Sequence, residues 1–191
     1  MELLLIRHGL PVRVDEGTVA GPADPDLSER GLAQAAALAD WLIGEAIDAI
    51  WVSPMRRAAQ TAAPLVQRLG LPVVIDEDIA EYDRDAASYI PIEELKAAND
   101  PRWREVPEQP EHFQAVVVAA IERIVAAHPR QRVAVVCHGG VINAYAAHVL
   151  GIADPLFFLP QYTSISRVFA ASTGERSVAS LNETAHVRGL L

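Results

Sequence analysis

The feature that most constrains the fold of this chain is the alternation of short apolar runs with long segments rich in Ala and Leu. Short runs rich in branched residues are typical of strands inside a sheet, and the longer segments carry helix start and stop signals. Such alternation indicates an α/β layer protein. We expect strands at 2–7, 47–52, 72–75, 132–137, 166–171 and 177–182. We expect helices from Ser28 to Ile43, from Arg56 to Leu69, from Glu111 to Ala127 and from Gly140 to Leu150.

Residues 82–110 interrupt the alternation. This segment contains four prolines, large aromatic residues that include Tyr89 and Trp103, and many charges. Long irregular segments in compact domains are often lids or binding loops. No repeat or Ser/Gly linker divides the chain, and 191 residues match the prior of one domain per roughly 150 residues. We therefore expect a single domain over 1–191, with a lid-like excursion at about 82–110.

The composition indicates which classes of partner the protein can bind and in which cellular compartment it is expected. A net charge of −9 argues against nucleic acid or an anionic membrane as a partner, because basic surfaces hold both. The single cysteine, Cys137, cannot form an intrachain disulfide, and no charged leader precedes the first apolar run. The longest apolar run, Ala115 to Ile121, is far shorter than the ~20 residues that span a bilayer. We expect a cytoplasmic protein with a small-molecule substrate, and the pattern carries no signal for its oligomeric state.

Arginine and histidine follow two of the predicted strands. Arg7 and His8 come directly after the apolar run 3–6, and Arg56 and Arg57 open the helix that follows the strand ending near Val52. Ligands of open α/β sheets bind beyond the carboxyl ends of the strands. A helix start that carries guanidinium groups is also suited to an anion. The alternative for each residue is a structural histidine or a solvated arginine.

Two further segments add a second histidine and an acid. His138 ends another predicted strand, and the paired glycines Gly139 and Gly140 allow the backbone to approach a ligand closely. Glu81 and Asp83 stand at the entrance to the irregular segment. From spacing alone, either acid could equally be a solvated loop residue.

Taken together, these segments resemble the histidine phosphatase superfamily, which includes cofactor-dependent phosphoglycerate mutases and many phosphatases. The resemblance rests on four motifs in order: "LLLIRHG" at the start, "LSERGLAQA" at 27–35, "SPMRRAAQTA" at 53–62, and "VAVVCHGGVI" at 133–142. It covers most of the chain. It implies a three-layer α/β/α sandwich with a mostly parallel central sheet, as in phosphoglycerate mutases.

The resemblance also implies a site and a reaction. His8 would be the nucleophile that forms a phosphohistidine, Glu81 would serve as general acid and base, and Arg56 would occupy a variable position. The phosphoryl-binding set would be Arg7, Arg57, His138 and Gly139. The implied activity is hydrolysis of small organic phosphomonoesters without cofactor or metal, since arginines supply the positive charge.

Other functions remain open at this point. A phosphoglycerate-type mutase is the nearest enzymatic alternative, but Leu10 and the absence of a Trp-Glu-Gly segment after the acid favour a phosphatase. A catalytically idle phosphate-binding regulatory module is the other. A cysteine phosphatase would need arginine where Asn143 stands, six residues after Cys137. We interpret the remaining histidines as structural or solvated: His112, His128, His148 and His186. Four arginines are either solvated or meet substrate charge: Arg13, Arg84, Arg102 and Arg104.

Overall fold

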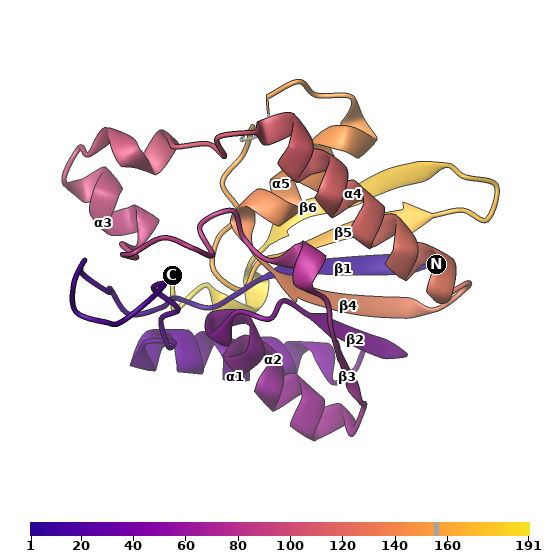
Figure 1. Ribbon diagram of the computed structural model, residues 1–191. Coiled ribbons are helices and arrows are strands. Elements are labelled where there is room, and N and C mark those ends of the chain that lie inside the picture. Colours follow the sequence, from indigo (N-terminus) through magenta and orange to yellow (C-terminus); the bar gives the residue numbers. More distant parts are fainter. Residues whose placement is uncertain (155–156) are drawn as a thin grey trace.

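A computed structural model describes residues 1–154 and 157–191 and contains one six-stranded sheet with helices on both faces (Figure 1). The strands are β1 (Glu2–Arg7), β2 (Ala49–Val52), β3 (Val73–Ile75), β4 (Arg132–Cys137), β5 (Ile165–Ala170) and β6 (Arg176–Glu183). The α-helices are α1 (Glu29–Leu42), α2 (Arg56–Leu69), α3 (Ile92–Ala97), α4 (Pro110–Ala127) and α5 (Gly139–Leu150). Three 3-10 turns complete the set: η1 (Glu77–Ile79), η2 (Pro101–Arg104) and η3 (Ala185–Val187).

The strand order is β3-β2-β4-β1-β5-β6. β1 pairs in parallel with β4, β4 with β2, and β2 with β3, whereas β5 is antiparallel to both β1 and β6. Of the strands that the structure describes, β5 alone therefore runs against the rest, which confirms the mostly parallel sheet. The carboxyl ends of β1, β2 and β4 lie at one edge, where a ligand site is expected.

Both faces of the sheet are buried. Leu3 and Leu5 of β1 belong to the core under α4 and α5, while Leu4 and Ile6 belong to the core above α1 and α2. All four side chains have no exposed surface. Alternate residues of a strand point to opposite faces, so one apolar run supplies both cores. This is the physical basis of the three layers in Figure 1.

The expected elements are present, with ends shifted by one or two residues. Ser28 is the N-cap of α1, where its side chain accepts a hydrogen bond from the Gly31 amide. The helix expected from Glu111 begins one residue earlier, at Pro110 of α4. Proline suits the first position of a helix, because an amide hydrogen there would have no partner within the helix. The expectation of buried strands is wrong for β3: Val73, Val74 and Ile75 are all exposed, because β3 is an edge strand with a partner on one side.

The irregular segment 82–110 contains two short elements that the sequence did not indicate, α3 and η2. A β-bridge between Val14 and Tyr89 joins it to the loop that follows β1. Figure 1 shows α3 beyond the carboxyl end of β1. Among residues 1–154 and 157–191, no helix is both long and apolar enough to cross a membrane.

Candidate active site

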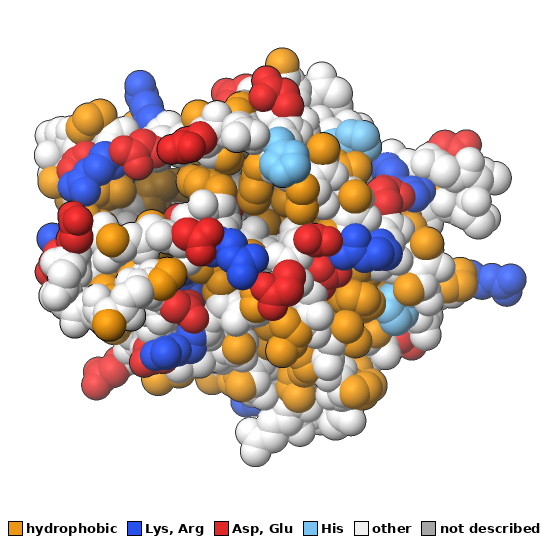
Figure 2. All heavy atoms as spheres, viewed as in Figure 1, with side chains coloured by type: hydrophobic (Ala, Val, Ile, Leu, Met, Phe, Trp, Pro, Cys, Tyr) orange, Lys and Arg blue, Asp and Glu red, His pale blue; other side chains and the backbone are white. Residues whose placement is uncertain are grey.

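A cavity of about 710 Å³ opens at the carboxyl ends of β1 and β4. Figure 2 shows the hollow on the side of the molecule where α3 lies. We use the name floor for five charged and histidine side chains at this end of the sheet. Arg7, His8, Arg57 and Glu81 line the cavity, and His138 lies beneath the lining with its ring centre 5.2 Å from that of His8. We call the lining residues of the irregular segment from 86 to 106 the roof. The structure therefore brings together five predicted site residues that lie up to 131 positions apart in the sequence.

His8 is buried, with 3% of its surface exposed. Its Nδ1 lies 2.7 Å from the carbonyl oxygen of Gly9. Because a carbonyl oxygen can only accept, Nδ1 carries the hydrogen and Nε2 keeps its lone pair. Burial lowers the pKa of His8 well below its ordinary value, and the guanidinium groups of Arg57 and Arg7 lower it further. His8 is thus a neutral imidazole in a fixed tautomer.

Arg7, the last residue of β1, is held from two sides. Its Nη1 donates to the carbonyl oxygen of Pro160 at 2.6 Å. Its guanidinium carbon lies 4.0 Å from the centre of the Tyr162 ring, a cation–π distance. These contacts fix the guanidinium beside His8.

Arg57 occupies the first turn of α2 and is 1% exposed. Its Nη2 donates to Oδ1 of Asp83 at 2.6 Å, and its guanidinium carbon lies 4.9 Å from the Tyr89 ring centre. The neighbouring Arg56 points away: its Nη1 lies 3.3 Å from the Asp26 carboxylate on the exposed surface. The structure thus places Arg57, and not Arg56, in the floor.

His138 caps the start of α5 and has no exposed surface. Its ring centre lies 5.2 Å from that of His8. Its Nε2 is 2.7 Å from Ser53 Oγ, which also accepts from the Met55 amide at 3.3 Å. The hydroxyl hydrogen of Ser53 is then free to point to Nε2, which leaves Nδ1 as the nitrogen that carries a hydrogen. Burial lowers the pKa of His138, and Arg57 and His8 lower it further, so the ring is neutral.

Four buried nitrogen atoms of the floor have no hydrogen-bond partner among the described residues. They are Arg7 Nε, Arg57 Nε, Arg57 Nη1 and His138 Nδ1. Buried donors are normally satisfied, because an unpaired donor loses the hydrogen bonds that water would have given it. A cluster of such donors beside a histidine is suited to a small polyoxygen anion such as a phosphoryl group.

Glu81 follows η1 and faces the start of α5. Its Oε2 accepts from the Gly140 amide at 2.8 Å, and its Oε1 accepts from the Tyr82 amide at 3.2 Å. A side chain at Gly140 would collide with this carboxyl group, so the glycine permits the approach. Burial raises the pKa of Glu81 to about 7, and the charge of Asp83 adds to the rise. The group can therefore both donate and accept a proton near neutral pH.

Several residues of the quoted motifs hold the floor in place, a role that sequence reasoning missed. Thr61 donates to the Arg57 carbonyl and accepts from the Gly9 amide, so it ties α2 to the loop after β1. Gln34 accepts from the Leu10 amide. A side chain at Gly31 would overlap the Leu10 carbonyl, so α1 can approach this loop only with glycine there. The motifs carried a signal for this role, because Gln34 and Thr61 are polar residues on helix faces that are otherwise apolar. Polar side chains that are buried in this way need hydrogen-bond partners.

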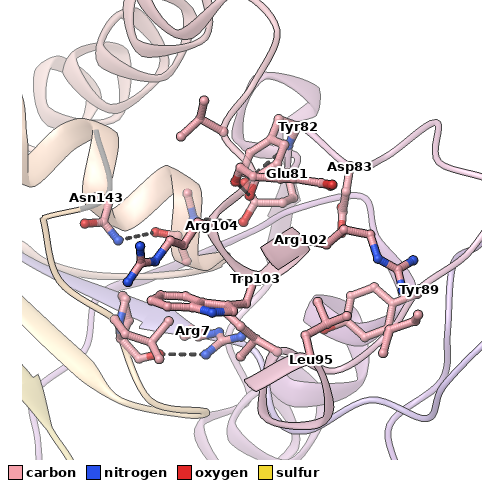
Figure 3. A pocket seen from close by; sticks show the side chains of 18 of the residues that line it. Arg7, Glu81, Tyr82, Asp83, Tyr89, Leu95, Arg102, Trp103, Arg104 and Asn143 are labelled. Atoms are coloured by element: carbon pink, nitrogen blue, oxygen red, sulfur yellow. Dashed lines mark hydrogen bonds between the residues drawn. The ribbon is translucent and has the colours of Figure 1, made fainter. Parts of the chain in front are cut away.

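Arg102, Trp103 and Arg104 of the roof line the cavity (Figure 3). The sequence alone did not decide whether these two arginines are solvated or meet the substrate. Arg13 and Arg84 form exposed ion pairs instead, with Asp15 and Glu77.

The four remaining histidines lie outside the cavity lining. His128 accepts from the Trp51 indole at 2.9 Å, and His186 contacts the Thr163 carbonyl, in agreement with a structural interpretation. Cys137 is fully buried at the end of β4, and burial raises the pKa of its thiol, which disfavours the thiolate that a nucleophile needs.

Comparisons with known proteins agree with this geometry. Residues 3–184 match the family model of the histidine phosphatase superfamily, branch 1. The chain is 32% identical over 163 residues to phosphoserine phosphatase 1 of Hydrogenobacter thermophilus, and this match covers 80% of this chain and 77% of that protein. It is 31% identical over 157 residues to a metal-independent phosphoserine phosphatase of Arabidopsis thaliana, covering 75% of this chain and 66% of that protein.

A solved structure supports the fold. The structure of a mycobacterial glucosyl-3-phosphoglycerate phosphatase superimposes with a TM-score of 0.74 at 24% identity, covering 96% of this chain and 99% of the other. The family match spans nearly the whole chain, and the relatives named here are phosphatases. This chain therefore belongs to the histidine phosphatase superfamily and is a phosphoric monoester hydrolase.

Proposed function

We propose that this protein hydrolyses small organic phosphomonoesters through a phosphohistidine on His8, without a metal ion, and that residues 1–191 act as one domain with 82–110 as its lid. The observation that carries the proposal is the neutral His8 ring, with Nδ1 donating to the Gly9 carbonyl, next to four unpartnered nitrogen atoms. A lone pair on a fixed imidazole is a competent nucleophile near pH 7.

In the first step, Nε2 of His8 attacks phosphorus and the bond from phosphorus to the alcohol oxygen breaks. Arg7, Arg57 and His138 donate hydrogen bonds to the three non-bridging oxygens, where the negative charge of the transition state is spread. These donors are fixed before the substrate arrives, by Pro160, Asp83 and Ser53 respectively. Donors fixed in advance need no reorganisation during the reaction, which is the main source of electrostatic catalysis.

Glu81 supplies the proton that the departing alcohol needs. With a pKa of about 7, a large fraction of this carboxyl group is protonated at neutral pH. In the second step, the resulting carboxylate takes a proton from water while the water oxygen attacks phosphorus, the bond to Nε2 breaks, and inorganic phosphate is released. One group then serves both steps, and His8 and Glu81 return to their starting states.

The relatives support phosphomonoesters as substrates. Two curated relatives are named phosphoserine phosphatases, and the mycobacterial neighbour acts on a glucosyl-phosphoglycerate. These substrates share a phosphoryl group on an alcohol oxygen and differ in the rest of the molecule. The shared part is the part that the floor would bind.

The test is chemical trapping of the intermediate. The protein is mixed with a phosphomonoester that carries radioactive phosphate and is quenched within milliseconds, and the labelled protein is digested under alkaline conditions that preserve phosphohistidine. We expect label on the peptide that contains His8. Hydrolysis without any label would contradict the proposal, and binding without turnover would indicate a regulatory module. Transfer of label to a second hydroxyl of phosphoglycerate, rather than to water, would indicate a mutase.

A further inference from the structure

We propose that the roof selects phosphomonoesters whose alcohol carries a bulky, largely apolar group, and that Trp103 is the specificity-determining residue. This inference rests on the proposed phosphatase function and extends it from the phosphoryl group to the leaving group. It predicts that phosphoserine and similarly small polar esters are poor substrates.

The size of the cavity supplies the first argument. At about 710 Å³ it lies within the range of roughly 300–1,000 Å³ that is typical of sites for drug-sized molecules. The floor donors gather around a single histidine and engage the phosphoryl group alone. A phosphoryl group with a two- or three-carbon alcohol would leave much of the space under the roof filled with water. The space is better matched by a larger leaving group.

The chemistry of the walls supplies the second argument. Away from the floor, much of the cavity lining is aliphatic or aromatic, and besides Trp103 it includes Ile90, Ile92, Leu95, Val106, Phe158 and Leu159. An apolar group that enters such a space is removed from water together with the side chains that it covers, which favours binding in proportion to the area buried. A serine-sized polar group would displace water from these side chains without that gain.

Trp103 is the side chain that is best placed to contact such a group. Figure 3 shows its indole in the middle of the cavity, with Arg104 on one side and Leu95 on the other. The guanidinium carbon of Arg104 lies 4.4 Å from the ring centre, and Nζ of Lys96 lies 4.9 Å from it. The turn that carries the indole, η2, is capped by the Asp100 side chain, which accepts from the Arg102 amide. These contacts hold the ring in the cavity.

The charges of the roof do not form a second anion site like the floor. Arg102 is engaged by both oxygens of Asp100. Glu105 also lines the cavity, and its negative charge opposes a carboxylate on the substrate. Arg104 is a lining arginine without a carboxylate partner in the part of the chain that the structure describes. Recognition of a carboxylate by Arg104 is therefore the competing hypothesis, and the experiment includes it.

The experiment compares propyl phosphate with 3-phenylpropyl phosphate. Both are esters of unactivated primary alcohols with similar leaving-group acidity, so the floor should treat them alike. Partial burial of the phenyl ring should raise kcat/KM for the larger ester by roughly 10- to 100-fold. Trp103→Ala should reduce this ratio to about threefold or less, and Trp103→Phe should give an intermediate value. The matched control is Trp41→Ala, an exposed tryptophan of α1 that lies outside the cavity lining, which should leave the ratio unchanged.

Two results would overturn the inference. One is a ratio near one in the wild-type protein. The other is a phosphoserine kcat/KM that exceeds that of 3-phenylpropyl phosphate and loses its advantage in Arg104→Ala. A complete absence of hydrolysis, including that of p-nitrophenyl phosphate, would count against the proposed function and not against this inference. In that case the dissociation constants of the two esters for the His8→Ala variant, measured by calorimetry, decide the inference: tighter binding of the phenyl ester supports it, and equal binding overturns it.

Discussion

The floor and the roof of the cavity are built by different physical means. Arg57 and His138 of the floor are 1% and 0% exposed. His138 contacts Ser53, which is fully buried, and Arg57 is paired with Asp83, whose side chain is 28% exposed. The roof residues Arg102 and Arg104 are exposed, and the Arg102 ion pair lies at the surface. Exposed ion pairs contribute little to stability, because water competes for both partners. The floor is therefore a rigid reaction centre, and the roof is a surface that can vary without loss of the fold.

This difference predicts that substitutions in the floor and in the roof have different kinetic effects. Changes in the floor should affect the chemical step with every substrate or with a defined chemical class of substrates. Changes in the roof should alter the preference among leaving groups. Substitutions in the floor test this division, from the largest expected effect to the smallest.

The largest effect is expected for His8→Ala. The substitution removes the nitrogen that attacks phosphorus, so both turnover and covalent labelling should fall below detection. Phosphate release and acid-quenched labelling are the measurements. Circular dichroism and thermal unfolding should remain close to those of the wild type, because the ring faces a cavity rather than either apolar core. Retained turnover in a folded variant would refute the phosphohistidine mechanism.

The next largest effect is expected for Glu81→Gln. An alkoxide leaves poorly without a proton, and general acid catalysis is worth roughly 10²–10⁴-fold where it is needed. The single-turnover rate of phosphoenzyme formation should therefore fall by about this factor with an alkyl phosphate. It should fall much less with an activated aryl phosphate, whose oxide leaves readily.

Steady-state rates would hide this contrast, because Glu81 also serves the hydrolysis step that both substrates share. Asp83→Asn is the matched control, since Asp83 contacts Arg57 and lies two residues further along. Equal losses with the two substrates in Glu81→Gln would remove this residue as the general acid. A selective loss with the alkyl ester in Asp83→Asn alone would move the role there.

Arg57→Ala should lower kcat/KM on the order of 10²- to 10³-fold, as expected when a fixed donor to the transition state is lost. Arg56→Ala should change it by less than about threefold, because the Arg56 side chain pairs with Asp26 on the surface. The adjacent pair makes the comparison sharp, since both substitutions remove one arginine from the same helix turn. Equal effects, or the reverse order, would show that the structure assigns the wrong arginine to the floor.

The pKa of Glu81 predicts a smaller, pH-dependent effect. Because its pKa is raised to about 7, the protonated form that donates to the alcohol is present below pH 7 and is lost above it. The single-turnover rate with an alkyl phosphate should be flat below this value and should fall about tenfold per unit above it. An aryl phosphate should show little change over the same range, and Glu81→Gln should abolish the alkyl dependence. A profile that rises with pH for both esters would contradict the assignment.

Most of the floor was predictable from the sequence, because Arg7, His8, Arg57 and His138 lie beside a strand end or a helix start that the apolar pattern marks. Glu81 follows the 3-10 turn η1 instead, and only the resemblance to a known family selected it. His8 follows β1, Arg57 opens α2, and His138 follows β4. Their partners were not predictable in the same way, because the pairing of Ser53 with His138 and of Thr61 with the Gly9 amide joins segments 85 and 52 residues apart. Only the folded sheet brings such segments together.

The roof and the sheet edge escaped prediction for two other physical reasons. The helix α3 has six residues, too few to show helical periodicity, and it is held by its neighbours in the fold rather than by propensity. The strand β3 has the apolar sequence of a buried strand, but its position at the edge of the sheet leaves it exposed. Local pattern identifies a strand, whereas burial depends on the order of the strands, which the pattern does not contain.

The smallest expected effect is that of a metal chelator, which should leave kcat/KM unchanged. The acids nearest the floor are already engaged: Glu81 accepts two backbone amide hydrogens, and Asp83 pairs with Arg57. Over residues 1–154 and 157–191 no group of three or more His, Cys, Asp or Glu side chains is arranged to hold a metal ion. The guanidinium groups of Arg7 and Arg57 would also repel a cation at the point where a catalytic metal would have to meet the phosphoryl oxygens. Activity measured before and after dialysis against EDTA is the check, with a Zn²⁺-dependent phosphatase treated in parallel to show that the chelator works. Strong inhibition that added Mg²⁺ or Zn²⁺ reverses would mean that the arginines do not suffice, and that the floor shares the neutralisation of charge with an ion.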